Sequence, residues 1–431
     1  MKVLFKTLGC KVNQYDTETL RELFACDNVY SVNEGFEIPD IVVVNSCTVT
    51  AESDRKTRQT VRKMRRLYPE AVIAVTGCMP QARPEKAKTV GEADIIIGNA
   101  LNSELPALVR EYMKTRSPIV ASKPHELHEK ISPLSSHSFE GRTRAFVKIE
   151  DGCNRFCSYC IVPYARGRVR SKSPDRITEE LTAFAAAGYK EAVISGINLS
   201  AYGSDIGLSL PDGIKAADVE GIERLRLGSL EPDQLTDKVL DGLKSVEKLC
   251  GQFHLSLQSG SDGVLKRMNR KYDTALYRRI ISGIRERFDN CSVTTDIMTG
   301  FPGETDEEFE ETLDFVREIG FSRVHIFCYS RREGTPAAEM ENQVDEHIKV
   351  LRSKKLEALA LSLSKDFFAR QVGRTENVLF ERQKDGFYEG YTENYTPVRV
   401  KTELPLKGKI ARVRLTSFGD GGCIGELENH D

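Results

Sequence analysis

The sequence predicts an α/β protein of three domains: an open parallel α/β sheet, a partial (β/α)6 barrel and a small C-terminal β-barrel. The chain has 431 residues, and a single hydrophobic core stops growing at roughly 250–300 residues. Short apolar runs alternate with helical patterns over about the first 330 residues, which predicts parallel strands. The last sixty or so residues change to short alternating runs separated by turn residues. We place the domains at 1–118, 141–369 and 370–431, with a linker over 119–140.

The N-terminal domain alternates apolar strand patterns with amphipathic helical patterns. Its predicted strands cover residues 2–7, 41–44, 72–76 and 95–97, and the clearest helices cover 17–26 and 52–68. This order is typical of an open α/β sheet. Pro, Ser and His residues are frequent from about 117 to 141, which indicates the linker.

The middle domain repeats strand and then helix six times, two units short of the eight-stranded closed barrel. Its predicted strands cover residues 145–150, 191–195, 224–227, 254–258, 292–298 and 324–329. The helices between them cover 174–187, 236–248, 275–288 and 307–319, and a charged amphipathic stretch follows over 345–371. The C-terminal runs TENVLFE, GFYEGYT, TPVRVKT and GKIARVRLTSF predict a five-stranded β-barrel of a kind that often binds oligonucleotides.

Composition excludes some classes of function. Hydrophobic residues make up 40% of the chain and charged residues 29%, an ordinary globular balance. The formal net charge is −2, so any surface for nucleic acid must be local. The sequence contains no apolar run of about 18 residues and begins with the strand-like KVLFKTLGC. We therefore expect a cytoplasmic protein with neither a membrane span nor a signal peptide.

Cysteine is abundant, and three of the eleven cysteines form a compact motif. Cys153, Cys157 and Cys160 have the spacing C-x3-C-x2-C directly after the first predicted barrel strand. Structural zinc needs a fourth Cys or His nearby, and a disulfide would leave one thiol over. An iron–sulfur cluster accepts three thiolates and leaves one iron open for the amino and carboxylate groups of a small molecule. S-adenosylmethionine is a molecule that fits this arrangement.

A second trio is spread along the N-terminal domain. Cys10, Cys47 and Cys78 each follow a predicted parallel strand at its carboxyl end, the edge where open α/β sheets bind ligands. They can therefore converge and hold a second cluster, although three buried structural cysteines are the simpler alternative. We expect the other five cysteines to fill the core: Cys26, Cys250, Cys291, Cys328 and Cys423.

The motifs of the whole chain resemble those of a known enzyme family. C-x3-C-x2-C after the first strand of a partial barrel resembles the radical S-adenosylmethionine superfamily, with its TIM-like barrel. The segments GCNRFCSYCIVPYARGRVRS, RLGSLEP, HLSLQSGSD and TDIMTGFPGET resemble its methylthiotransferase branch. That branch also has an N-terminal domain with three separated cysteines and a C-terminal OB-like TRAM domain. The resemblance thus covers essentially the whole chain.

The segments TLGCKVNQYDTE, NSCTVT and VTGCMPQ look most like the MtaB-type enzymes of this family. Those enzymes methylthiolate C2 of N6-threonylcarbamoyladenosine (t6A) at position 37 of tRNA, giving ms2t6A37. Lys11 and Val12 follow the first cysteine, whereas the isopentenyladenosine enzymes tend to have Gln-Met there and the ribosomal-protein enzymes Pro-Lys. Those two activities are the alternatives within the family. A non-catalytic zinc- and RNA-binding protein is the alternative from another class.

The resemblance implies two [4Fe–4S] clusters, one on Cys10, Cys47 and Cys78 and one on Cys153, Cys157 and Cys160. It also implies two S-adenosylmethionine molecules per turnover. One methylates a sulfur atom associated with the N-terminal cluster, and the other yields the radical that takes hydrogen from C2. No side chain is then catalytic, because the cofactor performs the difficult step.

Contacts to S-adenosylmethionine are expected at the ends of barrel strands. The family resemblance and barrel position indicate Gly196, Asn198, Gln258 and Gly300. The chain has SGIN where the wider superfamily has Gly-Gly-Glu, so individual roles differ from the general pattern. The simpler interpretation of these residues is ordinary turn and helix-cap chemistry.

Two basic segments are candidates for RNA contact. RKTRQTVRKMRR (residues 55–66) has seven basic and no acidic residues, and a second run follows the cysteine motif. The second run contains Arg166, Arg168, Arg170, Lys172 and Arg176. The simpler interpretation of both is a solvated charged face. Aromatic residues of the C-terminal barrel either stack on bases or fill its core, namely Phe387, Tyr388, Tyr391 and Tyr395. The implied partners are the anticodon stem-loop of tRNA and an electron donor of the flavodoxin or ferredoxin type.

Overall fold

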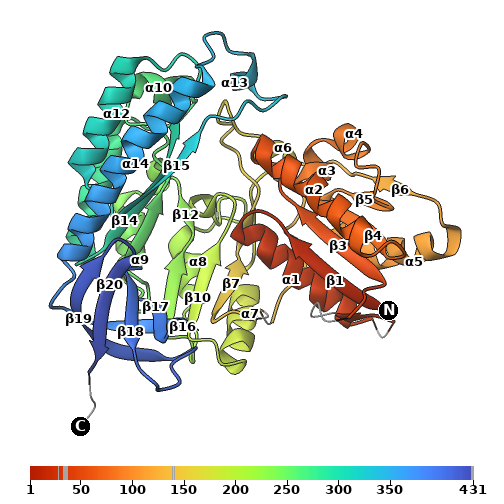
Figure 1. The fold of residues 1–431 in the computed structure, drawn as a ribbon, viewed down its shortest axis with the longest axis horizontal. Helices are drawn as coiled ribbons and strands as arrows, with labels where there is room; N and C mark the ends of the chain where they lie inside the picture. The colour runs from red at the N-terminus through yellow and green to blue at the C-terminus, as the bar shows by residue number, and fades with distance from the viewer. Residues whose placement is uncertain (28, 33–36, 138, 140, 429–431) are drawn as a thin grey trace. The chain divides into compact units, whose positions relative to one another are not determined.

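The computed structural model describes residues 1–27, 29–32, 37–137, 139 and 141–428, so the predicted boundaries at residues 140 and 431 lie outside it. The chain forms two compact units (Figure 1). The first unit consists of Met1–Ser138, Glu150–Lys172 and Ser330–Ala338. The second consists of Phe139–Ile149, Ser173–Tyr329 and Glu339–Asp431.

The first unit is built on a six-stranded parallel sheet in the order β2-β1-β3-β4-β5-β6. These strands are β1 (Lys2–Thr7), β2 (Ser31–Val32), β3 (Ile41–Ser46), β4 (Val72–Gly77), β5 (Ile95–Ile97) and β6 (Ile119–Ala121). The predicted parallel α/β sheet is confirmed. The sheet also takes in two short edge strands that the sequence did not predict, and β6 lies inside the predicted linker.

Helices cover both faces of this sheet. Leu20 and Phe24 of α1 (Lys11–Ala25) pack on one face together with α5 (Leu105–Thr115). Val61 and Met64 of α2 (Ala51–Leu67) pack on the other. Short helical segments complete the layers: α3 (Cys78–Ala82), α4 (Pro84–Ala87) and the 3-10 turn η1 (Asn99–Glu104).

Helix α1 begins six residues earlier than the apolar periodicity predicts. The cause is Asn13, a fully buried polar residue whose Nδ2 donates to the carbonyls of Leu8 (2.8 Å) and Ser46 (2.9 Å). A buried Asn with both bonds satisfied takes the place of an apolar residue in the first turn. The helix therefore starts directly after Cys10.

Two segments distant in sequence complete the first unit. Residues 150–172 contain β8 (Glu150–Asp151), α6 (Val162–Arg166) and β9 (Arg170–Ser171), with β8 and β9 paired antiparallel. In residues 330–338, the buried Arg332 donates to Asp54 (2.9 Å) and to Thr48 Oγ1 (2.7 Å). The short helix α13 (Pro336–Glu339) begins in this segment.

The second unit contains the partial barrel. Its parallel strands are β7 (Arg144–Lys148), β10 (Glu191–Ser195), β11 (Arg224–Leu227), β12 (Ser229–Leu230), β13 (Gln252–Leu255), β14 (Ser292–Thr299) and β15 (Arg323–Cys328). They form two sheets, β11-β10-β7 and β12-β13-β14-β15. Only Gly228 separates β11 from β12, so one interrupted strand joins the two sheets. The prediction of six strand–helix units in a partial barrel is confirmed.

Helices alternate with these barrel strands. They are α7 (Pro174–Ala186), α8 (Leu210–Ala216), α9 (Asp237–Lys244), α10 (Asp262–Arg267), α11 (Thr274–Arg287) and α12 (Asp306–Ile319), with 3-10 turns η2 (Leu199–Ala201) and η3 (Pro232–Gln234). A capping box of Thr305 and Glu308 starts α12, and Gly320 ends it in a left-handed conformation. Hydrophobic periodicity predicted α7, α9, α11 and α12. It did not predict α8 and α10, because these helices are too short to show a periodic pattern.

The C-terminal strands close into a barrel in the order β16-β17-β18-β20-β19. They are β16 (Thr375–Lys384), β17 (Phe387–Tyr391), β18 (Pro397–Lys401), β19 (Ile410–Gly419) and β20 (Gly422–Leu427). Phe367 and Phe368 of the preceding helix α14 (Glu346–Ala369) join its core. The predicted five-stranded barrel is confirmed. Across the described part of the chain, no helix combines the length and the apolarity that crossing a membrane requires.

Candidate functional site

Three cysteines meet at the carboxyl edge of the first unit's sheet. Strands β1, β3 and β4 are neighbours in parallel register, and Cys47 and Cys78 directly follow β3 and β4. Cys10 caps α1 after β1. A Cβ added to Gly9 would lie only 2.7 Å from the Cβ of Cys47. The structure thus brings together Cys10, Cys47 and Cys78, which lie far apart in sequence.

The thiols of this trio influence one another electrostatically. Burial raises the pKa of Cys78 to about 12; Arg166 works in the opposite direction, and Cys10 and Cys47 raise the pKa further. Burial likewise raises the pKa of Cys10, although that residue has an exposed surface. Three neighbouring thiolates repel one another and need positive charge from a bound metal before all can ionise. This donor set suits a metal cluster.

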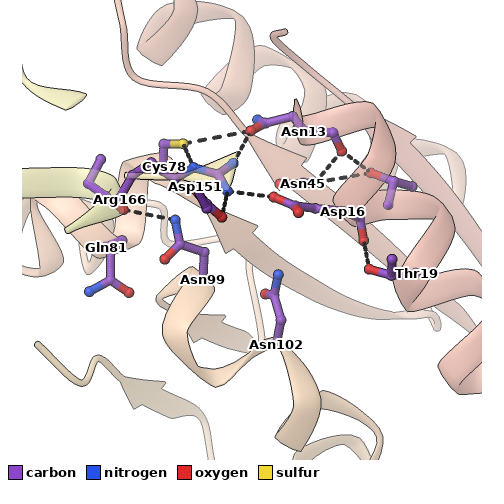
Figure 2. Close-up of polar contacts among 12 residues, drawn as sticks. Asn13, Asp16, Thr19, Asn45, Cys78, Gln81, Asn99, Asn102, Asp151 and Arg166 are labelled. Atoms are coloured by element: carbon purple, nitrogen blue, oxygen red, sulfur yellow. Dashed lines mark hydrogen bonds and ion pairs between the residues drawn. The ribbon is translucent and has the colours of Figure 1, made fainter. Parts of the chain in front are cut away.

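Arg166, at the end of α6, lies against Cys78 of the trio (Figure 2). Its Nε donates to Cys78 Sγ at 3.3 Å, and one terminal nitrogen donates to Asp16 (2.6 Å) and Asp151 (3.3 Å). The other terminal nitrogen donates to Asn13 Oδ1. Burial works to lower the pKa of Arg166, but Asp16, Cys78 and Asp151 outweigh it and raise the pKa well above its usual value. The residue is 2% exposed and stays charged.

Cys153, Cys157 and Cys160 lie in the turn region between β8 and α6, with Cys157 buried and the other two partly exposed. The backbone N–H of Cys153 donates to Gly167 (3.0 Å), and that of Cys160 donates to Cys157 (2.9 Å). Gly152 has a φ of +92°, and a Cβ there would lie 1.9 Å from the carbonyl oxygen of Arg168. Only glycine allows this close approach.

Both trios belong to the first compact unit. Within the described residues, no group of three or more His, Cys, Asp or Glu side chains is arranged to hold a single metal ion. A cluster makes a different demand, because each of its thiolates binds a different iron, whereas zinc ligands share one ion at about 2.3 Å.

The four residues expected to contact S-adenosylmethionine all follow strands of the second unit. Gly196 and the buried Asn198 come after β10, Gln258 after β13 and Gly300 after β14. Gln258 has a φ of +70°, which is uncommon for a residue with a side chain. Gly300 has a structural reason for its identity, since a Cβ there would lie 2.2 Å from Cγ of Lys349. Its N–H donates to Glu304 (2.6 Å).

The second basic run is mostly internal, which corrects part of the expected RNA surface. Arg166, Arg170 and Lys172 are buried. Arg170 donates to Glu129 (2.6 Å), and Lys172 donates to Tyr15 (3.0 Å). These three therefore leave the predicted RNA-contacting set. The charge pattern could not predict this burial, because it does not distinguish a solvated basic segment from one whose charges are neutralised by residues distant in sequence.

Other basic residues are exposed. Arg168 is exposed and lies 4.7 Å from the ring centre of Phe156. On α2 the exposed basic residues are Arg55, Lys56, Arg62, Lys63 and Arg66. Glu52 and Glu92 pair with some of them, but the helix retains a basic outer face.

The barrel aromatics serve the structure of the second unit. Tyr388 is part of the barrel core. Tyr391 and Tyr395 stack on each other with ring centres 4.4 Å apart, and the guanidinium of Arg144 lies within 5.4 Å of both. Phe387 packs against Arg399. Among the remaining cysteines, Cys250 and Cys423 are buried as expected, whereas Cys26 is exposed, so the core-filling prediction is wrong for Cys26.

Two family models match the chain. Residues 147–316 match the Radical SAM superfamily, and residues 2–98 match Uncharacterized protein family UPF0004. The first covers most of the barrel and the second most of the sheet with its cysteine trio. Together they define a radical enzyme that carries an added N-terminal sheet domain.

Curated relatives match over almost the whole chain. "Threonylcarbamoyladenosine tRNA methylthiotransferase MtaB" of Bacillus subtilis (strain 168) is 37% identical and covers 97% of this chain and 94% of its own. The enzyme of that name from Thermotoga maritima is also 37% identical, over 98% of this chain and 96% of its own. "tRNA-2-methylthio-N(6)-dimethylallyladenosine synthase" of Pelotomaculum thermopropionicum is 36% identical over 95% and 93%. The chain belongs to the radical S-adenosylmethionine methylthiotransferase family.

Solved structures agree on the fold. The radical S-adenosylmethionine methyltransferase TsrM from Kitasatospora setae has a TM-score of 0.58 and 16% identity, covering 78% of this chain and 74% of its own. The radical enzyme OxsB has a TM-score of 0.52 and 12% identity over 86% and 56%. Membership of the radical superfamily implies a [4Fe–4S] cluster and S-adenosylmethionine, and the N-terminal domain is consistent with a second cluster.

Proposed function

We propose that this enzyme methylthiolates C2 of N6-threonylcarbamoyladenosine at position 37 of tRNA. The observation that carries the methylthiotransferase part of the proposal is the pair of three-cysteine sites within one compact unit. The choice of nucleoside rests on the relatives. The relatives in Bacillus subtilis and Thermotoga maritima are named for this nucleoside, and each is 37% identical over nearly the full length.

Each trio holds one [4Fe–4S] cluster in this proposal. Cys10, Cys47 and Cys78 supply three thiolates to one, and Cys153, Cys157 and Cys160 supply three to the other. The fit rests on the donors: thiolates are the usual ligands of such clusters, and three of them leave one iron without a protein ligand. Burial raises the pKa of Cys10 and Cys78, and a bound cation would favour ionisation of such thiols.

The residues of the chain bind, orient and protect. When bound, the clusters and S-adenosylmethionine supply the one-electron radical chemistry that side chains do not supply. Gly196, Asn198, Gln258 and Gly300 orient S-adenosylmethionine at the carboxyl ends of barrel strands. Gly152 lets the second cysteine segment close on itself, and Asn13 and Arg166 fix the environment of Cys78. No side chain takes a catalytic role.

The anticodon stem-loop binds through local basic surfaces. The outer face of α2 and the exposed Arg168 lie in the same unit as both trios. Arg and Lys contacts to phosphates give binding that weakens as salt rises.

The electron donor is of the flavodoxin or ferredoxin type, and the enzyme works in the cytoplasm with its tRNA substrate. We also retain the domain boundaries at 140 and 369 as part of this proposal, whereas the N-terminal domain extends past 118 because β6 belongs to its sheet.

The substrate is tested by nucleoside profiling. Mass spectrometry of tRNA from a strain lacking the gene should show N6-threonylcarbamoyladenosine without its methylthio form, with recovery on complementation by the intact gene. Complementation with Cys157→Ala is the matched control and should not restore it. An unchanged level of the methylthio nucleoside in the deletion strain would refute this choice of substrate.

Isopentenyladenosine is a second candidate substrate. The Pelotomaculum thermopropionicum relative, named for dimethylallyladenosine, is 36% identical, almost as similar as the first group. The same profile separates the candidates, because this activity predicts loss of the methylthio group from isopentenyladenosine. If neither tRNA modification is lost, the ribosomal-protein aspartate becomes the candidate substrate. Mass spectrometry of that protein would then show whether its methylthio group is lost in the deletion strain.

A further inference from the structure

We propose that Arg166 is a positioning residue for the N-terminal cluster and raises the reduction potential of that cluster through an N–H···S hydrogen bond to Cys78. The inference rests on the proposed binding of a cluster by Cys10, Cys47 and Cys78. It adds a function for a residue of α6, a helix that follows the other cysteine trio in sequence.

The geometry separates the tasks of the guanidinium nitrogens (Figure 2). One terminal nitrogen donates to the two carboxylates, Asp16 (2.6 Å) and Asp151 (3.3 Å), and the other donates to Asn13. The remaining nitrogen, Nε, lies 3.3 Å from Cys78 Sγ. The planar fork of arginine fixes these directions together, so the carboxylates and the amide aim Nε at the sulfur.

An ion pair alone does not explain this arrangement. A lysine can neutralise Asp16 or Asp151, but it has no planar fork that holds an N–H on a third partner. Cys78 also faces Asn13 Oδ1 at 3.7 Å, with the thiol as donor. A thiolate ligand has no proton to donate. Of these two contacts of Cys78, the one from Arg166 therefore remains favourable after metal binding.

Hydrogen bonds to the sulfur atoms are one of the ways in which a protein sets a cluster's potential. Reduction adds one electron to the cluster and increases the negative charge on its sulfurs. A donor aimed at a sulfur therefore stabilises the reduced form more than the oxidised form. The bond from Arg166 is charge-assisted, and both Arg166 and Cys78 are buried, which strengthens it relative to an exposed contact.

The first experiment detects the bond without altering Arg166. Full-length chain carrying Cys153→Ala, Cys157→Ala and Cys160→Ala keeps only the N-terminal cluster. It is prepared without oxygen from cells fed 15N-arginine and is then reduced with dithionite. Pulsed EPR should show a 15N coupling to the reduced cluster that is absent from unlabelled protein. A bound, reduced cluster without this coupling would overturn the inference.

The second experiment measures the potential. In the same background, Arg166→Lys keeps a positive charge for Asp16 and Asp151 but removes Nε. We expect reduction to become about tenfold less favourable, which corresponds to a shift of about −59 mV for one electron. Arg332→Lys is the matched control, since Arg332 is also buried in the first unit and paired with a carboxylate, Asp54.

The outcomes are distinguishable from those of the proposed function. Absence of iron and sulfide from the chain that keeps only the N-terminal trio would refute the cluster itself. A bound cluster whose potential is equal in Arg166→Lys and its parent would refute the role of Arg166 alone. Should Arg166→Lys fail to bind a cluster, the 15N coupling in the parent decides the question by itself.

Discussion

The two cysteine trios of the first unit are assembled in opposite ways. Cys153, Cys157 and Cys160 lie within one short segment, so their proximity is local. Cys10, Cys47 and Cys78 come from three strand ends and meet only when β1, β3 and β4 pair in register. A local trio depends on the conformation of one segment, whereas a distributed trio depends on the whole sheet. The comparison predicts that each can be lost separately.

Replacing one cysteine of either trio should have the largest effect on activity, and the step that is lost should differ between the two trios. Cys157→Ala should abolish cleavage of S-adenosylmethionine and leave the N-terminal cluster in place. Cys47→Ala should retain cleavage and lose transfer of the methylthio group. Formation of 5′-deoxyadenosine and of methylthiolated RNA, measured in parallel, checks both. Cys26→Ala is the control, since Cys26 is exposed at the end of α1 and should change neither product. Retained cleavage by Cys157→Ala would break the assignment.

Backbone substitutions sharpen the same comparison. Gly77→Ala, beside Cys78, places a Cβ 2.4 Å from the carbonyl oxygen of Ser46 at a φ of +100°. Gly152→Ala, beside Cys153, places a Cβ 1.9 Å from the carbonyl oxygen of Arg168 at a φ of +92°. We expect each substitution to lower iron bound by its own trio only.

The control for backbone strain is Gly188→Ala. Gly188 has a φ of +90° but no atom within 4 Å of an added Cβ. It should cost only about 1–2 kcal/mol of strain and leave the iron content unchanged. Equal loss of iron in all three variants would show that general destabilisation, not the local approach, is responsible.

The second unit contains buried charged residues that stabilise its fold and are not expected to affect iron binding by the trios. Glu191 of β10 accepts from Arg226 of β11 at 2.8 Å, and Arg226 also donates to the carbonyls of Thr392 and Glu393. Glu191→Gln removes the partner of a buried charge, which costs about 3–5 kcal/mol. Hydrogen exchange of β10, β11 and residues 392–396 should rise, while the iron content of both trios stays the same.

The effect of Glu191 should depend on pH. Burial works to raise the pKa of Glu191, but Arg226 outweighs it and holds the pKa below its usual value. A lowered pKa in the folded state gives stability that is present above the unfolded value of about 4.5 and is lost as pH falls through the folded value. Urea unfolding of the cluster-free chain should therefore show a difference between parent and variant at pH 7 that shrinks at acid pH. A difference independent of pH would contradict this.

The smallest expected effect concerns RNA. Lys63→Ala and Arg66→Ala remove exposed charges of α2 and should each weaken tRNA binding a few-fold and reduce the salt dependence by about one phosphate contact. Lys238→Ala, at an exposed position of α9, is the control. Filter binding at several salt concentrations measures this. An unchanged slope in both α2 variants would move the RNA surface elsewhere.

Much of the fold was predictable, since buried β-branched runs mark the main strands. The edge strands β2 and β6 and the first turn of α1 were not, because two- or three-residue strands and a buried Asn13 leave no periodic signal. The sequence also did not predict that residues 150–172 belong to the first unit. It depends on contacts such as Arg166 to Asp16, between residues 150 positions apart.

The candidate site shows the same division. Spacing revealed Cys153, Cys157 and Cys160, and the shared strand end revealed Cys10, Cys47 and Cys78. The environment of these cysteines was misjudged, because Arg166 and Arg170 read as a solvated charge run. Their partners Asp16 and Glu129 lie in other segments, and only the folded chain brings such pairs together.

The most direct test is the metal content of the full chain purified without oxygen. Two clusters predict about eight iron and eight sulfide per chain, and about four of each after replacement of all three cysteines of either trio by alanine. Stoichiometric zinc without sulfide, or iron that disappears completely when only one trio is removed, would contradict two separate three-cysteine sites.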